Sequence, residues 1–97
     1  MGMERVINFA AGPPTWEAIQ REASAAGLPI SLRMIDGLPA FPDEVPAPDW
    51  RELRVGAPSG MMTLRRHPDR LEVVVWGNAD EKLRHEWEQL VACLERP

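Results

Sequence analysis

One stretch, residues 71–94, constrains the fold of this 97-residue chain more than any other. It opens with LEVVVW at 71–76, five apolar residues in six of which three are valine, which is typical of a well-buried strand. Gly77 ends that run, and Asn78 with Glu81 three residues later resembles the capping box of a helix start. An apolar stripe follows at helical spacing, made of Leu83, Trp87, Leu90, Val91 and Leu94. A buried strand that leads into an amphipathic helix predicts a helix packed on a sheet.

The remaining elements are predicted from periodicity and from stop signals. A strand over 5–10 precedes a helix over 16–26, which Thr15 can cap and which Gly27 and Pro29 end. Period-2 alternation predicts three further strands, at 30–34, 50–55 and 61–66. Turn residues at Asp36-Gly37, 57–60 and 67–70 connect strands, so the last three strands are expected to form an antiparallel meander.

These elements predict one α+β domain over residues 1–97. We expect a two-layer sandwich, in which a largely antiparallel sheet of 4–5 strands carries two helices on one face, in the order β-α-β-(β)-β-β-β-α. The optional strand lies near 38–41, inside a proline-rich acidic loop at 37–49, where proline permits only a short edge strand. Within this loop, Leu38, Phe41 and Val45 are expected to anchor the chain to the body of the domain.

Composition restricts the compartment and the class of partner. A single cysteine cannot form an internal disulfide, and no apolar run approaches the ~20 residues that span a bilayer. Glu4 and Arg5 make the N-terminal residues too charged for a signal peptide, so we expect a cytoplasmic protein without a membrane partner. The net charge is −4, and residues 36–49 hold four carboxylates and no base, whereas residues 50–76 carry a small excess of arginine.

Residues that could carry catalysis are few and far apart. His67 and Asp69 could serve as a base and its orienting carboxylate, but their place beside Pro68 is explained by turn chemistry alone. His85 falls on the solvated side of the last helix, and Cys93, at the flank of the apolar stripe, is expected to pack as a small hydrophobe. We therefore expect no catalytic residues, no metal site and no cofactor.

The sheet face turned away from the helices is a candidate interaction surface. Alternation assigns to it more apolar and aromatic residues than a solvent face needs, among them Trp50, Trp76, Val74, Met61, Arg33, Arg54 and Arg65. Trp50 and Trp76 are predicted to share this face. Three interpretations compete: the proline-rich loop or the chain ends cover it, it binds a protein (a second copy or another chain), or it binds single-stranded nucleic acid.

The sequence favours a non-catalytic interaction or accessory protein, self-associating through this face or binding another protein. The alternative is a small-ligand-binding domain with an apolar pocket between sheet and helices, lined by Trp16, Trp87 and Phe9. The weaker alternative is a binder of single-stranded nucleic acid, because three arginines against Glu52 and Glu72 give a weak field for phosphates.

Overall fold

The computed structural model describes residues 2–77 and 79–95. In this part of the chain the elements are β1 (Met3–Asn8), α1 (Trp16–Ala25), β2 (Ser31–Ile35), β3 (Leu38–Pro39), β4 (Glu52–Ala57), β5 (Gly60–His67), β6 (Arg70–Val75) and α2 (Glu81–Leu94). Of the helices described, none combines the length and the apolar character that a membrane crossing requires.

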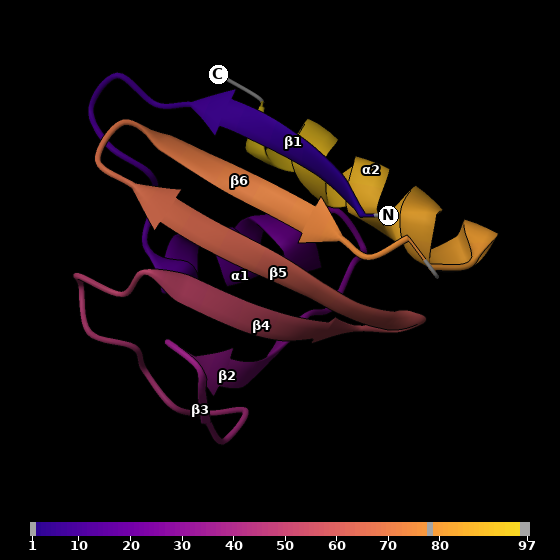
Figure 1. Cartoon of the computed structure of the whole chain (residues 1–97), viewed down its shortest axis with the longest axis horizontal. Helices are drawn as coiled ribbons and strands as arrows, with labels where there is room; N and C mark the ends of the chain where they lie inside the picture. Colours follow the sequence, from indigo (N-terminus) through magenta and orange to yellow (C-terminus); the bar gives the residue numbers. More distant parts are fainter. Residues whose placement is uncertain (1, 78, 96–97) are drawn as a thin grey trace.

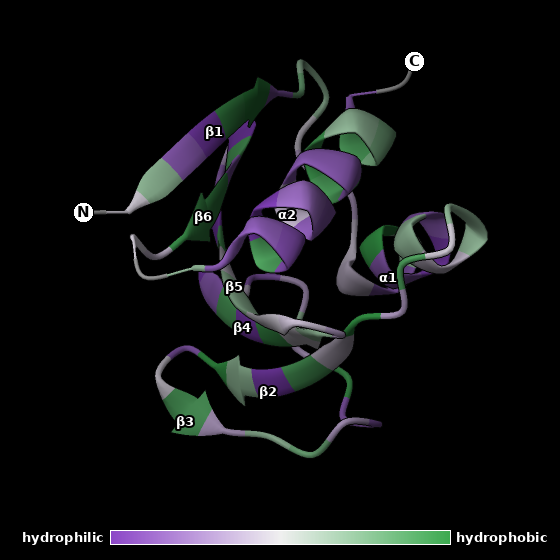
Figure 2. Ribbon diagram, turned by 90° about the vertical axis from the view of Figure 1, so that its right-hand side faces the viewer, coloured by the Kyte–Doolittle hydropathy of each residue, from purple (hydrophilic) through white to green (hydrophobic). Residues whose placement is uncertain are grey.

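The strands form one sheet in the order β1-β6-β5-β4-β2-β3, and all neighbouring strands are antiparallel. Both helices lie on the same face of the sheet (Figures 1 and 2), which confirms the predicted α+β sandwich. The sheet has six strands instead of the predicted 4–5, because the two-residue β3 pairs with Met34 and Ile35 and thereby joins it.

The core fills the space between the sheet and the helices, on what we call the inner face. The predicted stripe of α2 is buried, and Trp87 also donates a hydrogen bond from Nε1 to the carbonyl oxygen of Val73, 3.0 Å away. Trp16, Ile19 and Ala23 add the buried side of α1. The sheet contributes fully buried side chains from its three central strands: Leu53, Val55, Met62, Leu64, Leu71, Val73 and Val75.

The two helices begin with side-chain caps, and only one of these caps was predicted. Thr15 caps α1, since its Oγ1 accepts from the Ala18 N–H at 3.2 Å. The cap of α2 is Asp80, whose Oδ1 accepts from the Leu83 N–H at 2.8 Å. A hydrogen bond from the Ala79 N–H to the Trp76 carbonyl closes a turn before the helix. The helix therefore starts at Glu81, after the predicted position. The predicted cap, Asn78, lies outside the described residues.

The proline-rich loop is held by other residues than those predicted. Leu38, Phe41 and Val45 are between 68 % and 75 % exposed, so the expectation that they anchor the loop is wrong. Pro46 is buried instead, and it lies with the residues before α1 around a hollow of about 210 Å³. The rigid ring of a proline can fill such a position without the loss of rotamer freedom that Phe41 would suffer.

Candidate interaction surface

The sheet face opposite the helices, here called the outer face, is made by the residues that alternate with core positions. The registers align them in rows across the sheet: Glu4, Val74, Thr63 and Arg54 in one row, and Val6, Glu72, Arg65 and Glu52 in the next. In Figure 1 no described helix or strand lies in front of this face. The loop does not cover it either, because residues 45–48 line the hollow beside the N-terminus of α1.

Trp50 does not belong to the outer face. It is buried in the core, and the guanidinium carbon of Arg66 lies 5.5 Å from its ring centre. Arg66 also donates from Nε to the Trp50 carbonyl oxygen at 2.8 Å. The prediction that Trp50 and Trp76 share a face is wrong because β4 starts at Glu52, so strand alternation does not reach Trp50. A turn bond from the Trp50 N–H to the Ala47 carbonyl redirects the chain there.

Val74 lies on the predicted face but is not available to a partner. It is buried, as is its cross-strand neighbour Thr63, although no layer of the described chain covers them. Their neighbours in the row, Glu4 and Arg54, carry longer side chains, and strands stand ~4.8 Å apart, so these flanking side chains are within reach of the short ones. Val74 thus adds almost no accessible area to the outer face.

Two exposed apolar residues of the outer face, Trp76 and Met61, lie together, and we call them the Trp76–Met61 patch; a third, Val6, lies apart from them on β1. Trp76 is 47 % exposed and Met61 is 41 % exposed. The register of β5 with β6, continued beyond Val74, places the two opposite each other. Together with Ser59, Ala79 and the start of α2 they line a hollow of about 310 Å³. The patch therefore lies at the end of the sheet where β6 leads into α2.

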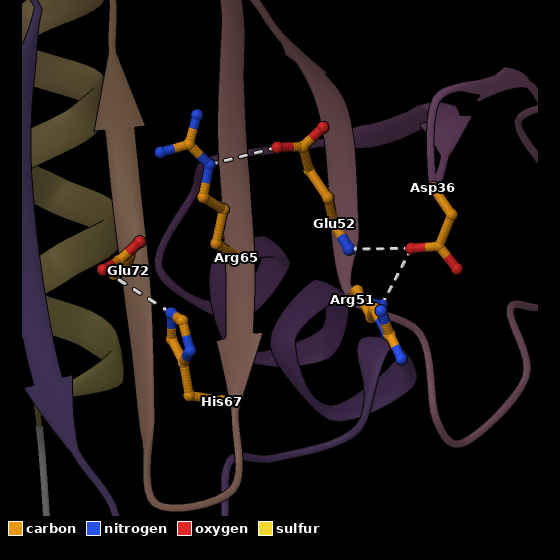
Figure 3. Close-up of polar contacts among 6 residues, drawn as sticks. All are labelled: Asp36, Arg51, Glu52, Arg65, His67 and Glu72. Atoms are coloured by element: carbon orange, nitrogen blue, oxygen red, sulfur yellow. Dashed lines mark hydrogen bonds and ion pairs between the residues drawn. The ribbon is translucent and has the colours of Figure 1, made fainter.

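Acidic side chains stand beside basic ones on the outer face. Arg65 Nε lies 3.0 Å from Glu52 Oε1, and His67 Nε2 lies 3.5 Å from Glu72 Oε1 (Figure 3). The predicted surface residue Arg33 lies over Gly56, since a Cβ built on that glycine would stand 2.8 Å from Arg33 Nε. Acidic and basic side chains thus alternate across the rows, and the face has no continuous basic track.

Asp36 makes a contact that sequence reasoning missed. Its Oδ1 accepts hydrogen bonds from the backbone N–H groups of Arg51 and Glu52, both at 2.8 Å (Figure 3). These bonds, that from Glu52 first, lower the pKa of the Asp36 carboxyl group below its ordinary value. Asp36-Gly37 was predicted only as a turn, and Asp36 adopts the left-handed φ of 49° that such a turn needs. The carboxylate fixes this turn to the start of β4.

The three residues expected to line one ligand pocket do not come together. Trp16 lines the hollow of about 210 Å³ beside the proline-rich loop, and Phe9 lines a different hollow with Leu94. Trp87 packs in the core, with the Arg5 guanidinium carbon 5.4 Å from its ring centre. The prediction of a shared pocket is wrong because side chains fill the space between sheet and helices.

The groups considered for catalysis contact other residues of the fold. His67 faces Glu72 and not the expected Asp69, which pairs with Arg70 at 3.0 Å. The hydroxyl of Ser59 donates to Glu86 Oε2 at 2.7 Å, and its N–H donates to Oε1 at 3.0 Å, so this carboxylate fastens the β4–β5 turn to α2. Two positions are as predicted: His85 is exposed and Cys93 is buried.

Metal ligation has no candidate in the described residues, since no group of three or more His, Cys, Asp or Glu side chains is arranged to hold an ion. Neither a protein-family model, nor a curated protein, nor a solved structure matches this chain.

Proposed function

We propose that this domain is a non-catalytic interaction module of the cytoplasm that binds a protein partner through the Trp76–Met61 patch. The observation that carries the proposal is a tryptophan, 47 % exposed, beside a half-exposed methionine on a sheet face without a covering layer. Tryptophan and methionine are enriched in interface cores, and tryptophan is a frequent hot-spot residue. The adjoining hollow of about 310 Å³ could take one apolar side chain of the partner.

The surroundings of the patch indicate how the partner is held. Arg65 is already paired with Glu52, and acidic and basic side chains are interspersed on the rest of the face, so it presents no large field of one sign to an oppositely charged surface. Binding should therefore depend on apolar burial and change little with salt, because only exposed charges are screened strongly. Arg54, on the neighbouring row, is available to set the orientation of the partner.

The test is affinity capture from the source cell with three baits, followed by quantitative mass spectrometry. The baits are the wild type, Trp76→Ser, and Leu38→Ser as a matched control that removes an exposed apolar side chain elsewhere. We expect a protein that the wild type and Leu38→Ser retain up to molar salt and that Trp76→Ser loses. Equal capture by all three baits would exclude the patch as the binding surface.

A small-ligand function is the second proposal, and it now rests on the hollow of about 210 Å³ beside the proline-rich loop. Trp16, Trp50 and Arg66 surround this hollow, which gives it aromatic walls and one cationic group. Its volume is below the ~300–1,000 Å³ of most ligand sites, which is why it ranks second. Titration with small aromatic carboxylates, followed by tryptophan fluorescence, tests it; a response that persists in Arg66→Ala argues against this site.

Binding of single-stranded nucleic acid is the weakest proposal. Trp76 is one stacking platform, whereas non-specific binders combine several aromatic residues with a basic groove. Glu4, Glu52 and Glu72 lie between the arginines of the outer face and weaken its attraction for phosphates. Fluorescence anisotropy with a labelled oligonucleotide at low salt tests it, and a rise that Trp76→Ser removes would favour it over protein binding.

A further inference from the structure

The two edges of the sheet differ in how well they are protected from another strand. One edge is β3, which has two residues, includes Pro39 and is followed by Pro42. Proline and short length are the usual protection of an edge. The opposite edge is β1, which has six residues without proline, glycine or bulge and pairs in an unbroken register with β6 alone among the described strands. β1 therefore offers an open row of backbone donors and acceptors.

The register identifies the residues that carry the open groups. The Phe9 N–H bonds the Asp69 carbonyl at 2.8 Å, and these two residues continue the β1–β6 register. Because hydrogen-bonded pairs alternate along an antiparallel ladder, the odd residues of β1 bond to β6. The N–H and C=O groups of Glu4, Val6 and Asn8 consequently face away from the sheet. All three residues are exposed, Val6 at 42 %.

We propose that a second copy of this chain pairs with β1 in antiparallel orientation across a two-fold axis at Val6, which joins two sheets into one. In this register Val6 faces the partner's Val6, and Glu4 faces the partner's Asn8. The open backbone N–H and C=O groups of these three residues are then hydrogen-bonded in each copy. A one-residue slip would set open groups against groups already bonded to β6, so it is excluded by the alternation of the ladder.

The two registers that are shifted by two residues are disfavoured, one by like charges and the other by the end of β1. A shift by two residues toward the N-terminus would place Arg5 directly opposite the partner's Arg5, and like charges directly across a strand pair are destabilising. A shift by two toward the C-terminus would move Glu4 opposite the partner's Ala10. There β1 has ended and a turn bond joins the Gly12 N–H to the Phe9 carbonyl, so one pair of the ladder is lost.

The residues on the inner side of β1 also favour the register centred on Val6. A hollow of about 490 Å³ lies there between residues 6–10 and the end of α2, at Leu94 and Glu95. The Val6-centred register brings the partner's Met3 opposite Phe9, beside Leu94. It also brings the partner's Arg5 opposite Ile7, at the hollow that Glu95 lines, while the guanidinium carbon of each Arg5 lies 5.4 Å from the ring centre of its own Trp87. An apolar side chain thus meets an apolar wall, and a cation comes to a hollow that holds a carboxylate, which is why a second copy fits this edge.

This inference concerns a different surface from the Trp76–Met61 patch and does not depend on it. The test is sedimentation velocity over a concentration series for the wild type, Val6→Lys, Val6→Glu and an equimolar mixture of the two variants. We expect a wild-type dimer, and dissociation constants raised about tenfold for each variant alone, because like charges then meet on the axis. The mixture should recover a dimer at least as stable as the wild type.

Two controls make the result specific. Leu38→Lys adds a charge at the opposite edge and should leave the dimer unchanged, and so should Trp76→Ser. Circular dichroism verifies that each variant is folded. A wild type that stays monomeric at millimolar concentration overturns the proposal, and so does a mixture of Val6→Lys and Val6→Glu that associates no better than either variant.

Discussion

The two faces of β6 have similar apolar composition and very different surroundings. On the inner face Leu71, Val73 and Val75 are fully buried beneath the helices. On the outer face Val74 is also buried, whereas Trp76 is 47 % exposed. The difference shows that burial on the outer face depends on position within the sheet. Val74 lies between paired residues of β1 and β5, while Trp76 lies one residue beyond the end of β6, with Met61 on one side and Gly2, which has no side chain, on the other.

Truncation of a tryptophan on the inner face should have the largest effect on stability. Trp87→Ala removes a buried ring and its hydrogen bond to the Val73 carbonyl, and should lower the free energy of unfolding by ~3–5 kcal/mol. His85→Ala, on the exposed side of the same helix, should cost less than ~0.5 kcal/mol. Chemical denaturation of both variants measures this, and equal midpoints would contradict the helix orientation.

A polar contact on the helix side should have an intermediate effect. Glu86→Ala leaves the N–H and the hydroxyl of Ser59 without their carboxylate partner, so we expect a loss of ~1–2 kcal/mol. Glu88→Ala is the matched control, because Glu88 is exposed on the same helix and should change stability by less than ~0.5 kcal/mol. If thermal denaturation gives equal shifts, the contact does not stabilise the turn.

Truncation of the tryptophan of the outer face should lower stability much less. Trp76→Ser should cost ~1 kcal/mol or less, since about half of this side chain is already in water. Partner capture should nevertheless be lost. A destabilisation as large as that of Trp87→Ala, measured in the same denaturant series, would mean that Trp76 belongs to the core and not to a binding surface.

The smallest expected effect lies at the Asp36 turn and depends on pH. A folded-state pKa below the ordinary 3.8 means that the carboxylate stabilises the fold above that pH and loses this contribution as pH falls through the lowered pKa. Asp36 is exposed, so Asp36→Asn should cost less than ~1 kcal/mol at pH 7. Denaturation of both proteins between pH 7 and pH ~2.5 should show this gap closing in acid. A constant gap would assign the effect to turn geometry instead.

Local patterns predicted the elements well and their three-dimensional neighbours poorly. The alternation of β5, the stripe of α2 and the turn at Asp36-Gly37 each depend on residues close in sequence, and the structure agrees with them. Trp50 was misplaced because it lies two residues before the start of β4, where the period-2 rule no longer applies. The contact of Glu86 with Ser59 spans 27 residues, and no local signal in either segment indicates it.

The candidate surface was predicted only in part for the same reason. Sequence alternation assigned Trp76, Met61 and Val74 to one face, and the registers agree with that assignment. It could not tell that Val74 would be buried, because burial there depends on the residues that flank it across three strands. Nor could it tell that the proline-rich loop would turn toward α1 and leave the face open.

The strand order has a consequence for how the domain folds. β4, β5 and β6 follow one another along the chain, so their pairing closes only short loops and can form early. β1 is synthesised before the other described strands, yet its one strand partner in the described sheet is β6, which follows all of them along the chain. The N-terminal segment must therefore stay unpaired during synthesis until the meander is complete. A nascent chain stalled before Arg70 would leave this segment accessible to chaperones and proteases.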